Sequence, residues 1–314
     1  MQNHINSHVC ASSSTCETAY QVVAVVVAHN RHIELKQVIS ALLKQTRGVS
    51  HIWIVDNQST TPIKDGLSEE HQQSNIVSVY RSGENTGGAG GFAFGLNQAM
   101  EYFQSATHFW LMDDDAVPEQ DALEKIVLSK AFNHPNTGVL CSSVIESHQI
   151  APIHRRYFHK RFGLESAISI SIYHKDEIEI DTGSFVGFLV SRKVVEKVGL
   201  PDSSFFIAYD DTDYSLQIKQ AGFKLWLIPQ SKIIHLRLAK RLRDSPFSQK
   251  HYYNIRNRIV VMQRYAEQKT ISSLIASVIG FGLLFACKSW KNWTSVKMCC
   301  SAIKAGWQSN LKKL

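Results

Sequence analysis

The stretch that most constrains the fold is residues 109–115, where the apolar run Phe-Trp-Leu-Met is followed by three consecutive aspartates. Aromatic and large aliphatic residues favour strands, and a short apolar run is typical of a strand buried on both faces. Adjacent carboxylates repel one another, so they must point into water, hold protons or share a cation. Because open α/β sheets bind ligands at the carboxyl ends of parallel strands, the stretch predicts a central strand that ends in a solvated acidic turn or a divalent-metal site.

Short apolar runs alternate with helical patterns along the first half of the chain. Residues 21–28 are almost all valine or alanine, and apolar residues then recur at helical spacing from 35 to 43. Further predicted strands lie at 51–55, 76–80, 138–144 and 223–228. Strands that alternate with helices indicate an α/β fold with a doubly wound, mostly parallel sheet. Since polar residues follow several of these strands, the arrangement is typical of a nucleotide site.

The second half of the chain is less regular. Residues 151–161 are basic and aromatic without clean periodicity, so we expect an insertion or loop there. Strands are predicted at 167–173 and 181–191. Asp210, Asp211 and Asp213 open a predicted helix that stops at Gly222. Acidic residues suit a helix N-terminus for dipole reasons alone, so this cluster is either a cap or a functional group.

The chain of 314 residues suits one large domain, or one domain with an appendage. Its net charge of +7 indicates an anionic partner, and residues 288–314 hold six lysines and no acidic residue. The six cysteines lack paired zinc-ligand spacing, which favours reduced thiols in a cytosolic setting. Residues 1–19 are polar without the regions of a signal peptide, and are predicted to be a flexible leader.

The C-terminal region, residues 246–314, is predicted to be helical. Residues 271–287 are apolar apart from serines, which fits a buried core helix, an interfacial segment or a marginal membrane span. One face of the next helix carries Trp293, Val296, Cys300, Ile303 and Trp307 with lysines at its edge. A helix lying among lipid headgroups needs such a face, although a helix packed on its own domain shows one too.

Three kinds of chemistry compete for the aspartates at 113–115. The first is metal-dependent glycosyl transfer from a nucleotide diphosphate. The second is dinucleotide binding, because residues 88–93 fit G-x-G-x-x-A, but six residues separate the preceding strand from Gly87 and one ribose does not need three acids. The third is a phosphoaspartyl phosphatase, which Asp113-x-Asp115-x-Val117 resembles, but that reading leaves the glycine loop unexplained.

Six motifs together suggest a family. They are Ala28-His29-Asn30-Arg31, Asp56-Asn57-Gln58-Ser59, the loop from Glu84 to Phe92 (ENTGGAGGF), Asp113-Asp114-Asp115, Tyr209-Asp210-Asp211 and His235. Over residues 21–235 this order resembles family 2 glycosyltransferases of the GT-A fold, and more narrowly the bacterial galactofuranosyltransferases. Residues 252–258 resemble a motif that follows the catalytic domain in O-antigen rhamnosyl- and galactofuranosyltransferases. The resemblance implies a GT-A catalytic domain over residues 20–245.

The resemblance also implies a role for individual residues. Asn30, Arg31 and Asp56 would line the uridine and diphosphate pocket, and Asn85, Gly87, Gly88 and Asp113 would approach the donor. Asp113, Asp115 and His235 would hold Mn²⁺ or Mg²⁺. Asp211 would be the general base, with Tyr209, Asp210 and Arg256 on the acceptor side. Asp213 is expected to be a cap, and Asp114 is expected to point away from its neighbours because strand side chains alternate.

The implied function is inverting transfer of galactofuranose from UDP-galactofuranose to a polyprenyl-diphosphate-linked glycan, such as an O-antigen. The implied location is cytoplasmic and peripheral, at the inner face of the cell membrane, with anionic lipid and no nucleic acid as partner. Two alternatives stay open: a dTDP-rhamnose-dependent transferase of the same fold, and a membrane-associated nucleotide-sugar- or glycan-binding subunit without catalysis. His29 and Tyr209 stand where the family commonly has other aromatic residues, which leaves acceptor recognition undetermined.

Overall fold

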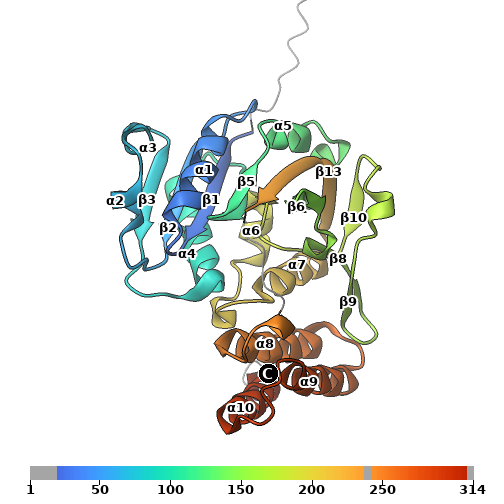
Figure 1. Cartoon of the computed structure of the whole chain (residues 1–314). Coiled ribbons are helices and arrows are strands. Elements are labelled where there is room, and N and C mark those ends of the chain that lie inside the picture. Colours follow the sequence, from blue (N-terminus) through green and yellow to red (C-terminus); the bar gives the residue numbers. More distant parts are fainter. Residues whose placement is uncertain (1–19, 237–241, 310–314) are drawn as a thin grey trace, which may run out of the picture.

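The computed structural model describes residues 20–236 and 242–309 (Figure 1). Within these residues, a ten-stranded sheet has the order β10-β13-β6-β12-β4-β1-β2-β3, with β5 paired to β13 and β7 to β6. A second sheet consists of β11, β8 and β9. The strands are β1 (Val22–Ala28), β2 (His51–Asp56), β3 (Val77–Arg81), β4 (His108–Asp113), β5 (Ala116–Pro118), β6 (Thr137–Glu146), β7 (Gln149–Ile150), β8 (Arg155–His159), β9 (Leu164–Ala167), β10 (Ile178–Ile180), β11 (Thr182–Gly183), β12 (Phe188–Ser191) and β13 (Lys224–His235). The leader predicted over 1–19 lies outside the described residues.

Helices cover both faces of the large sheet and form a separate layer at its lower end (Figure 1). They are α1 (His32–Leu43), α2 (Ile63–Gly66), α3 (Glu69–Gln73), α4 (Gly87–Tyr102), α5 (Ala122–Val127), α6 (Arg192–Val198), α7 (Asp210–Gln220), α8 (Gln249–Tyr265), α9 (Lys269–Ala286) and α10 (Trp293–Ser309). Short 3₁₀ turns occur at Lys130–Asn133, Pro152–His154, Ile170–Ile172, Ser203–Phe205 and Leu242–Asp244.

The valine run of β1 divides the core into two halves. Alternate residues of a strand point to opposite faces, so Ala24, Val26 and Ala28 share one apolar cluster with α1. Val25 and Val27 belong to a second cluster with α4. Every residue of β1 is buried, as a strand covered on both faces requires. The predicted doubly wound, mostly parallel α/β sheet is therefore confirmed.

The parallel strands bring three motifs to one edge of the sheet. β1 pairs with β2 and β4, and the register places Ala28 opposite Asp56 and Val27 opposite Asp113. The polar residues that follow these strands are therefore neighbours in space. β12 runs antiparallel between β4 and β6, an insertion into the sheet that the sequence does not predict.

Several predictions for residues 151–191 are wrong. The basic stretch at 151–161 contains β8, which pairs with β9 and β11. The predicted strand at 167–173 is mostly a loop with the 3₁₀ turn Ile170–Ile172, because Ile168 and Tyr173 are buried in the core without strand pairing. The predicted strand at 181–191 is divided into β11 and β12, which belong to different sheets.

α8, α9 and α10 pack around a small apolar core of their own. Ile255 and Ile259 of α8 contact residues of α9 and α10 in this cluster. Val296, Ile303 and Trp307 pack against the same core, so most of the α10 face predicted to meet lipid is packed on the protein itself. Among the described helices, α9 alone is long and apolar enough to cross a membrane by length and composition, and one third of it (33%) is buried.

Candidate active site

Three predicted metal ligands converge at the edge of the large sheet. Asp113 ends β4, Asp115 lies in the following turn, and His235 ends β13, whose antiparallel pairing with β5 places it opposite Ala116. The ligand atoms of Asp113, Asp115 and His235 all lie within 4.8 Å of one another. Asp115 Oδ1 is buried and accepts no hydrogen bond from any residue that the structure describes, although it lies 3.3 Å from His235 Nε2.

The electrostatics of this cluster fit a cation. Burial, with the charge of Asp115, raises the pKa of Asp113 to about 6. Burial lowers the pKa of His235, but the close approach of the Asp115 carboxylate, the hydrogen bond to Glu146 and the charge of Asp113 raise it to about 9. Two carboxylates and one imidazole are suitable ligands for Mn²⁺, and the unpartnered oxygen of Asp115 gives such an ion a place to bind. The three residues therefore fit the implied metal.

A carboxylate that the sequence analysis missed lies behind His235. Glu146 Oε1 is 2.8 Å from His235 Nδ1 and 3.0 Å from His154 Nε2. Hydrogen bonds from His154 and His235 lower the pKa of Glu146 to about 2. An ionised Glu146 accepts the Nδ1 proton of His235, which turns Nε2 toward Asp115. No sequence motif marks Glu146, although it ends a strand, β6.

Asp114 points away from the cluster, as expected, but it is not free. Its Oδ2 accepts a hydrogen bond of 2.8 Å from the His29 backbone N–H, and its Oδ1 accepts one of 2.9 Å from Arg31 Nη1. Arg31 Nη1 also lies 2.7 Å from Asp115 Oδ2. Asp114 is buried, and this burial raises its pKa to about 7. The side chain joins the end of β1 to the aspartate turn.

Two of the residues expected to bind the nucleotide hold loops in place. Asp56 is fully buried and accepts hydrogen bonds from the backbone of Ser59 and Ile63 and from Arg81. Asn30 Oδ1 accepts a hydrogen bond of 2.7 Å from the Thr60 backbone N–H. The structure therefore directs the Asp56 carboxylate into the protein, whereas Asn30 is exposed at the edge of the site.

Asn57 connects this loop to the glycine loop. Its Nδ2 donates to Asn85 Oδ1 at 3.2 Å and to the Gly87 carbonyl at 2.9 Å, and its Oδ1 accepts from the Thr86 N–H. Asn85 is exposed, so Asn57 fixes the position of a side chain that faces solvent. Asn57 belongs to the motif Asp56-Asn57-Gln58-Ser59, but the sequence alone does not indicate this role.

The glycines of this loop have different functions. Gly87 has φ +70°, and a Cβ there would collide with the Phe206 carbonyl group. A Cβ at Gly91 would lie 2.6 Å from Val27 Cγ1, so this glycine allows α4 to pack closely on β1. Gly88 has no atom within 4 Å of its Cβ position. Of the two glycines expected to approach the donor, Gly88 is therefore open and Gly87 is closed by protein.

The loop before α7 has an unusual backbone conformation. Phe206, Ala208 and Tyr209 have φ of 63°, 67° and 68°, which residues other than glycine rarely adopt. Such residues persist only where their surroundings determine them, and they cluster at functional sites. Here the Phe206 carbonyl accepts a hydrogen bond of 3.1 Å from the Ala89 N–H at the start of α4.

α8 holds the other side of this loop. Asn257, which is buried, donates from Nδ2 to the carbonyls of Phe205, Ile207 and Ala208 at 2.7 to 2.9 Å. Arg256 Nη2 donates to the carbonyls of Ser204 and Phe205. The structure therefore does not bring the Arg256 guanidinium to the acceptor side, because it is used in contacts with the loop backbone.

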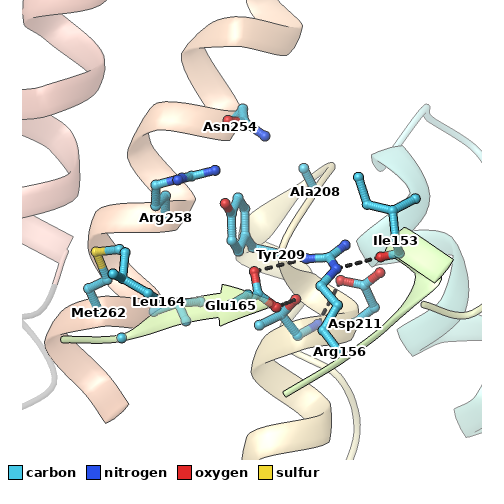
Figure 2. Close-up of a pocket in the computed structure, with 13 residues that line it drawn as sticks. Ile153, Arg156, Leu164, Glu165, Ala208, Tyr209, Asp211, Asn254, Arg258 and Met262 are labelled. Carbon is cyan, nitrogen blue, oxygen red and sulfur yellow. Dashed lines mark hydrogen bonds and ion pairs between the residues drawn. The ribbon is translucent and has the colours of Figure 1, made fainter. Parts of the chain in front are cut away.

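The loop leads into a cavity of about 420 Å³ (Figure 2). Its polar lining comes from β8, β9, α7 and α8: Arg156, Glu165, Tyr209, Asp211, Thr212, Asn254 and Arg258. Arg156 Nη1 lies 2.8 Å from Glu165 Oε2. Arg258 lies over the Tyr209 ring at 5.5 Å, and its buried Nε has no hydrogen-bond partner among the described residues. The basic sequence at 151–161 was the available signal for Arg156.

The acidic residues of α7 differ in their surroundings. Burial raises the pKa of Asp211, and the charge of Arg156 opposes this. Burial, with the charge of Asp211, raises the pKa of Asp210. Asp213 does not cap α7, because its Oδ1 is 2.7 Å from Arg264 Nη1 on α8. The charge of Asp211 also raises the pKa of Asp113, so these two carboxyl groups interact electrostatically.

Comparison with known proteins identifies the family. The model of glycosyl transferase family 2 matches residues 23–199, more than half of the chain. Galactofuranosyltransferase GlfT1 of Mycolicibacterium smegmatis is 27% identical over 217 residues, covering 68% of this chain and 70% of that protein. The dTDP-rhamnosyl transferase RfbF of Shigella flexneri is 25% identical over 258 residues, covering 77% of this chain and 80% of that protein.

Solved structures show the same fold. The crystal structure of GalNAc-T7 with UDP, GalNAc and Mn²⁺ superimposes with a TM-score of 0.61 at 14% identity, covering 83% of this chain and 51% of that chain. S. aureus TarS 1-349 in complex with UDP gives 0.53 at 12% identity, covering 85% and 72%. The predicted GT-A fold is confirmed, and the chain is a glycosyltransferase that belongs to glycosyl transferase family 2.

Proposed function

We propose that this protein transfers galactofuranose from UDP-galactofuranose to a lipid-linked glycan, with inversion at the anomeric carbon and dependence on a divalent metal. The observation that carries the proposal is that the chain has both a candidate metal cluster, formed by Asp113, Asp115 and His235, and a cavity lined by Asp211. Similarity to galactofuranosyltransferase GlfT1 supports the choice of donor. Two similar structures are complexes with UDP, which supports a uridine nucleotide.

On the donor side, Asp113, Asp115 and His235 would hold Mn²⁺ or Mg²⁺, and the positive charge held there would offset the negative charge that develops on the departing diphosphate. Arg31 adds a cation beside Asp115, and its side chain is 36% exposed, so it can reach a phosphate. Gly88 has open space where a Cβ would stand, which allows the donor to approach the backbone there.

On the acceptor side, Asp211 is the general base. It accepts the proton of the acceptor hydroxyl as the hydroxyl oxygen bonds to the anomeric carbon. The bond from that carbon to the diphosphate oxygen breaks on the opposite face, and the nucleotide leaves with the electron pair. The attack and the departure occur on opposite faces, so the configuration inverts. Asp210 and Tyr209 lie next to Asp211 and contact the acceptor.

The cavity beside Asp211 accommodates the acceptor. Arg258 lies over Tyr209 with its Nε unpartnered, which suits a sugar hydroxyl or a phosphate of a polyprenyl-diphosphate-linked glycan. Arg156 forms an ion pair with Glu165. The pair therefore adds little net charge to the cavity, and its polar atoms can orient the acceptor. Such an acceptor places the enzyme at the cytoplasmic face of the cell membrane as a peripheral protein.

Two other functions remain to be distinguished. Similarity to the dTDP-rhamnosyl transferase RfbF specifically favours a dTDP-rhamnose-dependent transferase on the same scaffold. A subunit that binds nucleotide sugars or glycans without catalysis would keep the metal cluster but need no base in the cavity.

A donor panel separates these functions. Purified protein is incubated with Mn²⁺ and UDP-galactofuranose, UDP-galactopyranose or dTDP-rhamnose, with and without EDTA, and released nucleotide is measured. We expect EDTA-sensitive release of UDP from UDP-galactofuranose above the other donors. Preferential release of dTDP would replace the donor assignment, and binding of a donor without any release, with acceptor glycans supplied, would indicate a binding subunit.

A further inference from the structure

α9 carries an exposed apolar stripe along its outward side. Ile271, Leu274, Val278, Phe281 and Phe285 follow one another at intervals of three and four residues, so they share one helix face. Their exposed fractions are 48%, 54%, 70%, 41% and 60%. Contiguous exposed apolar patches of this kind are rare on soluble proteins and mark interaction sites.

Two exposed tryptophans follow α9 in the chain, and the centre of the Trp290 ring lies 6.1 Å from that of Phe285. Trp290 is 48% exposed and Trp293 is 68% exposed. Lys291 Nζ lies 5.0 Å from the centre of the Trp290 ring, and Lys297 Nζ lies 5.6 Å from that of Trp293. We call the five apolar residues of α9 together with Trp290 and Trp293 the α9 face.

The opposite side of α9 is packed on the protein. A Cβ at Gly280 would lie 3.0 Å from Ile255 of α8, and Ser277 Oγ accepts a hydrogen bond of 3.2 Å from Trp307 Nε1 of α10. A helix packed in this way cannot be surrounded by lipid unless it leaves α8 and α10. Its 18 residues correspond to about 27 Å, slightly less than a bilayer core of about 30 Å.

The charges around the α9 face identify its partner. From Lys269 to the C-terminus the sequence contains seven lysines and no acidic residue. Tryptophan and lysine beside an apolar helix face are typical of helices that lie in the headgroup region of anionic membranes. A second copy of this chain would bring these lysines against one another, which disfavours a dimer through this face.

α8 packs against α9 and also lines the acceptor cavity, so the α9 face lies close to that cavity. Asn254 and Arg258 of α8 line the acceptor cavity. In the ribbon view, α8 lies between α7 and α9 (Figure 1). Packed helices are about 8–10 Å apart, so a surface at the α9 face lies one helix layer from the side of α8 that lines the cavity.

We propose that the α9 face docks in the interface of an anionic bilayer, parallel to its plane, and so presents the acceptor cavity to lipid-linked substrate. The inference rests on the proposed function for its purpose, since a lipid-linked acceptor makes the attachment useful. The docking itself requires no transfer reaction, so it can fail or succeed independently.

The first test measures binding of the full chain to vesicles by cosedimentation. Vesicles of equal parts phosphatidylglycerol and phosphatidylcholine are compared with pure phosphatidylcholine. We expect stronger binding to the anionic vesicles, and a loss of roughly tenfold or more in the double variant Val278→Asp/Phe285→Asp. The matched control is Leu128→Asp, which changes a 69% exposed leucine at the end of α5 and should bind as the unchanged chain does.

The second test measures how deeply the α9 face enters the bilayer. Four of the six tryptophans are buried or half-buried, so brominated phospholipid should quench mainly Trp290 and Trp293. The variant Trp290→Phe/Trp293→Phe should lose most of this quenching, whatever its transferase activity.

Four outcomes would overturn the inference. These are no vesicle binding by the unchanged chain, equal binding to both vesicle types, binding that the double variant retains, and resistance of bound protein to alkaline carbonate, which indicates a span. A dimer that the double variant abolishes, without vesicle binding, would assign the face to a second copy. Donor hydrolysis measured without vesicles reports on the proposed function separately.

Discussion

The two sides of the active site are held by different kinds of structure. Asp113 ends a buried strand that is paired on both sides, Asp115 lies in the turn after it, and His235 ends a long paired strand. Asp211, in contrast, begins a helix after a loop with three strained residues, and hydrogen bonds from α8 hold that loop. The metal side therefore depends on the sheet, whereas the base side depends on contacts between distant helices.

Because the two sides are held differently, substitutions on each side should have different effects. A sheet fixes strand ends through many backbone hydrogen bonds, so only changes to the ligands themselves should disturb metal binding. A loop with positive φ returns to ordinary conformations when its supports are removed. Changes in α8, away from the reacting atoms, should therefore impair transfer while the donor still binds.

Asp115→Asn should have the largest effect, because Asp115 is both a proposed metal ligand and an ion-pair partner of Arg31. We expect kcat/KM to fall by at least about 10²-fold, with a comparable loss of Mn²⁺ affinity measured by calorimetry. Asp121→Asn, on the surface beside α5, serves as the control and should change neither quantity. Retention of Mn²⁺ affinity in Asp115→Asn would contradict the proposed ligand set.

Glu146→Gln should weaken metal binding without removing a ligand. The variant loses the charge that accepts the Nδ1 proton of His235, so His235 Nε2 is less well oriented. Loss of such an outer partner costs about 10- to 100-fold in metal affinity. Calorimetric titration with Mn²⁺ measures the change, and an unaltered affinity would show that Glu146 does not position His235.

Asn257→Ala should impair the base side selectively. The variant leaves the carbonyls of Phe205, Ile207 and Ala208 without their shared donor, which should lower the free energy of unfolding by about 1–3 kcal/mol. We expect kcat to fall roughly tenfold while Mn²⁺-dependent UDP binding stays within about twofold. Asn97→Ala on α4 controls for loss of an asparagine far from this loop. Equal losses of UDP binding and kcat would show that the two sides are not separable.

A pair of cavity variants should move the pH dependence of transfer in opposite directions, with the smallest change in rate. Asp211 must be ionised to accept a proton, so kcat/KM should fall as the pH drops below its pKa, which burial raises. Arg156 lowers this pKa and Glu165 raises it, so Arg156→Gln should shift the acid limb to higher pH and Glu165→Gln to lower pH. Shifts in the same direction would mean that another group titrates.

The sequence predicts that Asp113 and Asp115 lie at the edge of the sheet, and the prediction has a physical reason. Parallel strands end at a common edge, so apolar runs followed by polar residues already indicate which side chains are neighbours. Asp113 and Asp115 could therefore be placed together without a structure, and the family resemblance added His235. Asp114 shows the limit of this reasoning. Its direction was predicted, but the Arg31 ion pair that makes it structural was not.

The base side could not be predicted in the same way. The role of Asn257 depends on where α8 crosses the loop before α7, and local sequence contains no such information. Arg256 and Arg258 differ by two positions on one helix, and only the packing of α8 decides that Arg258 faces the cavity. Arg156 and Glu165 meet across a β-hairpin that the irregular sequence at 151–161 concealed.

The most direct test of the division into two sides measures UDP binding and glycosyl transfer in one variant, Asp211→Asn. We expect this variant to bind UDP with Mn²⁺ as tightly as the unchanged chain does, whereas its transfer to an acceptor should fall by roughly 10²-fold or more. Asp115→Asn, measured in parallel, should lose both Mn²⁺-dependent UDP binding and transfer. Full transfer activity in Asp211→Asn, or loss of its Mn²⁺-dependent UDP binding, would contradict the division of the site into a metal side and a base side.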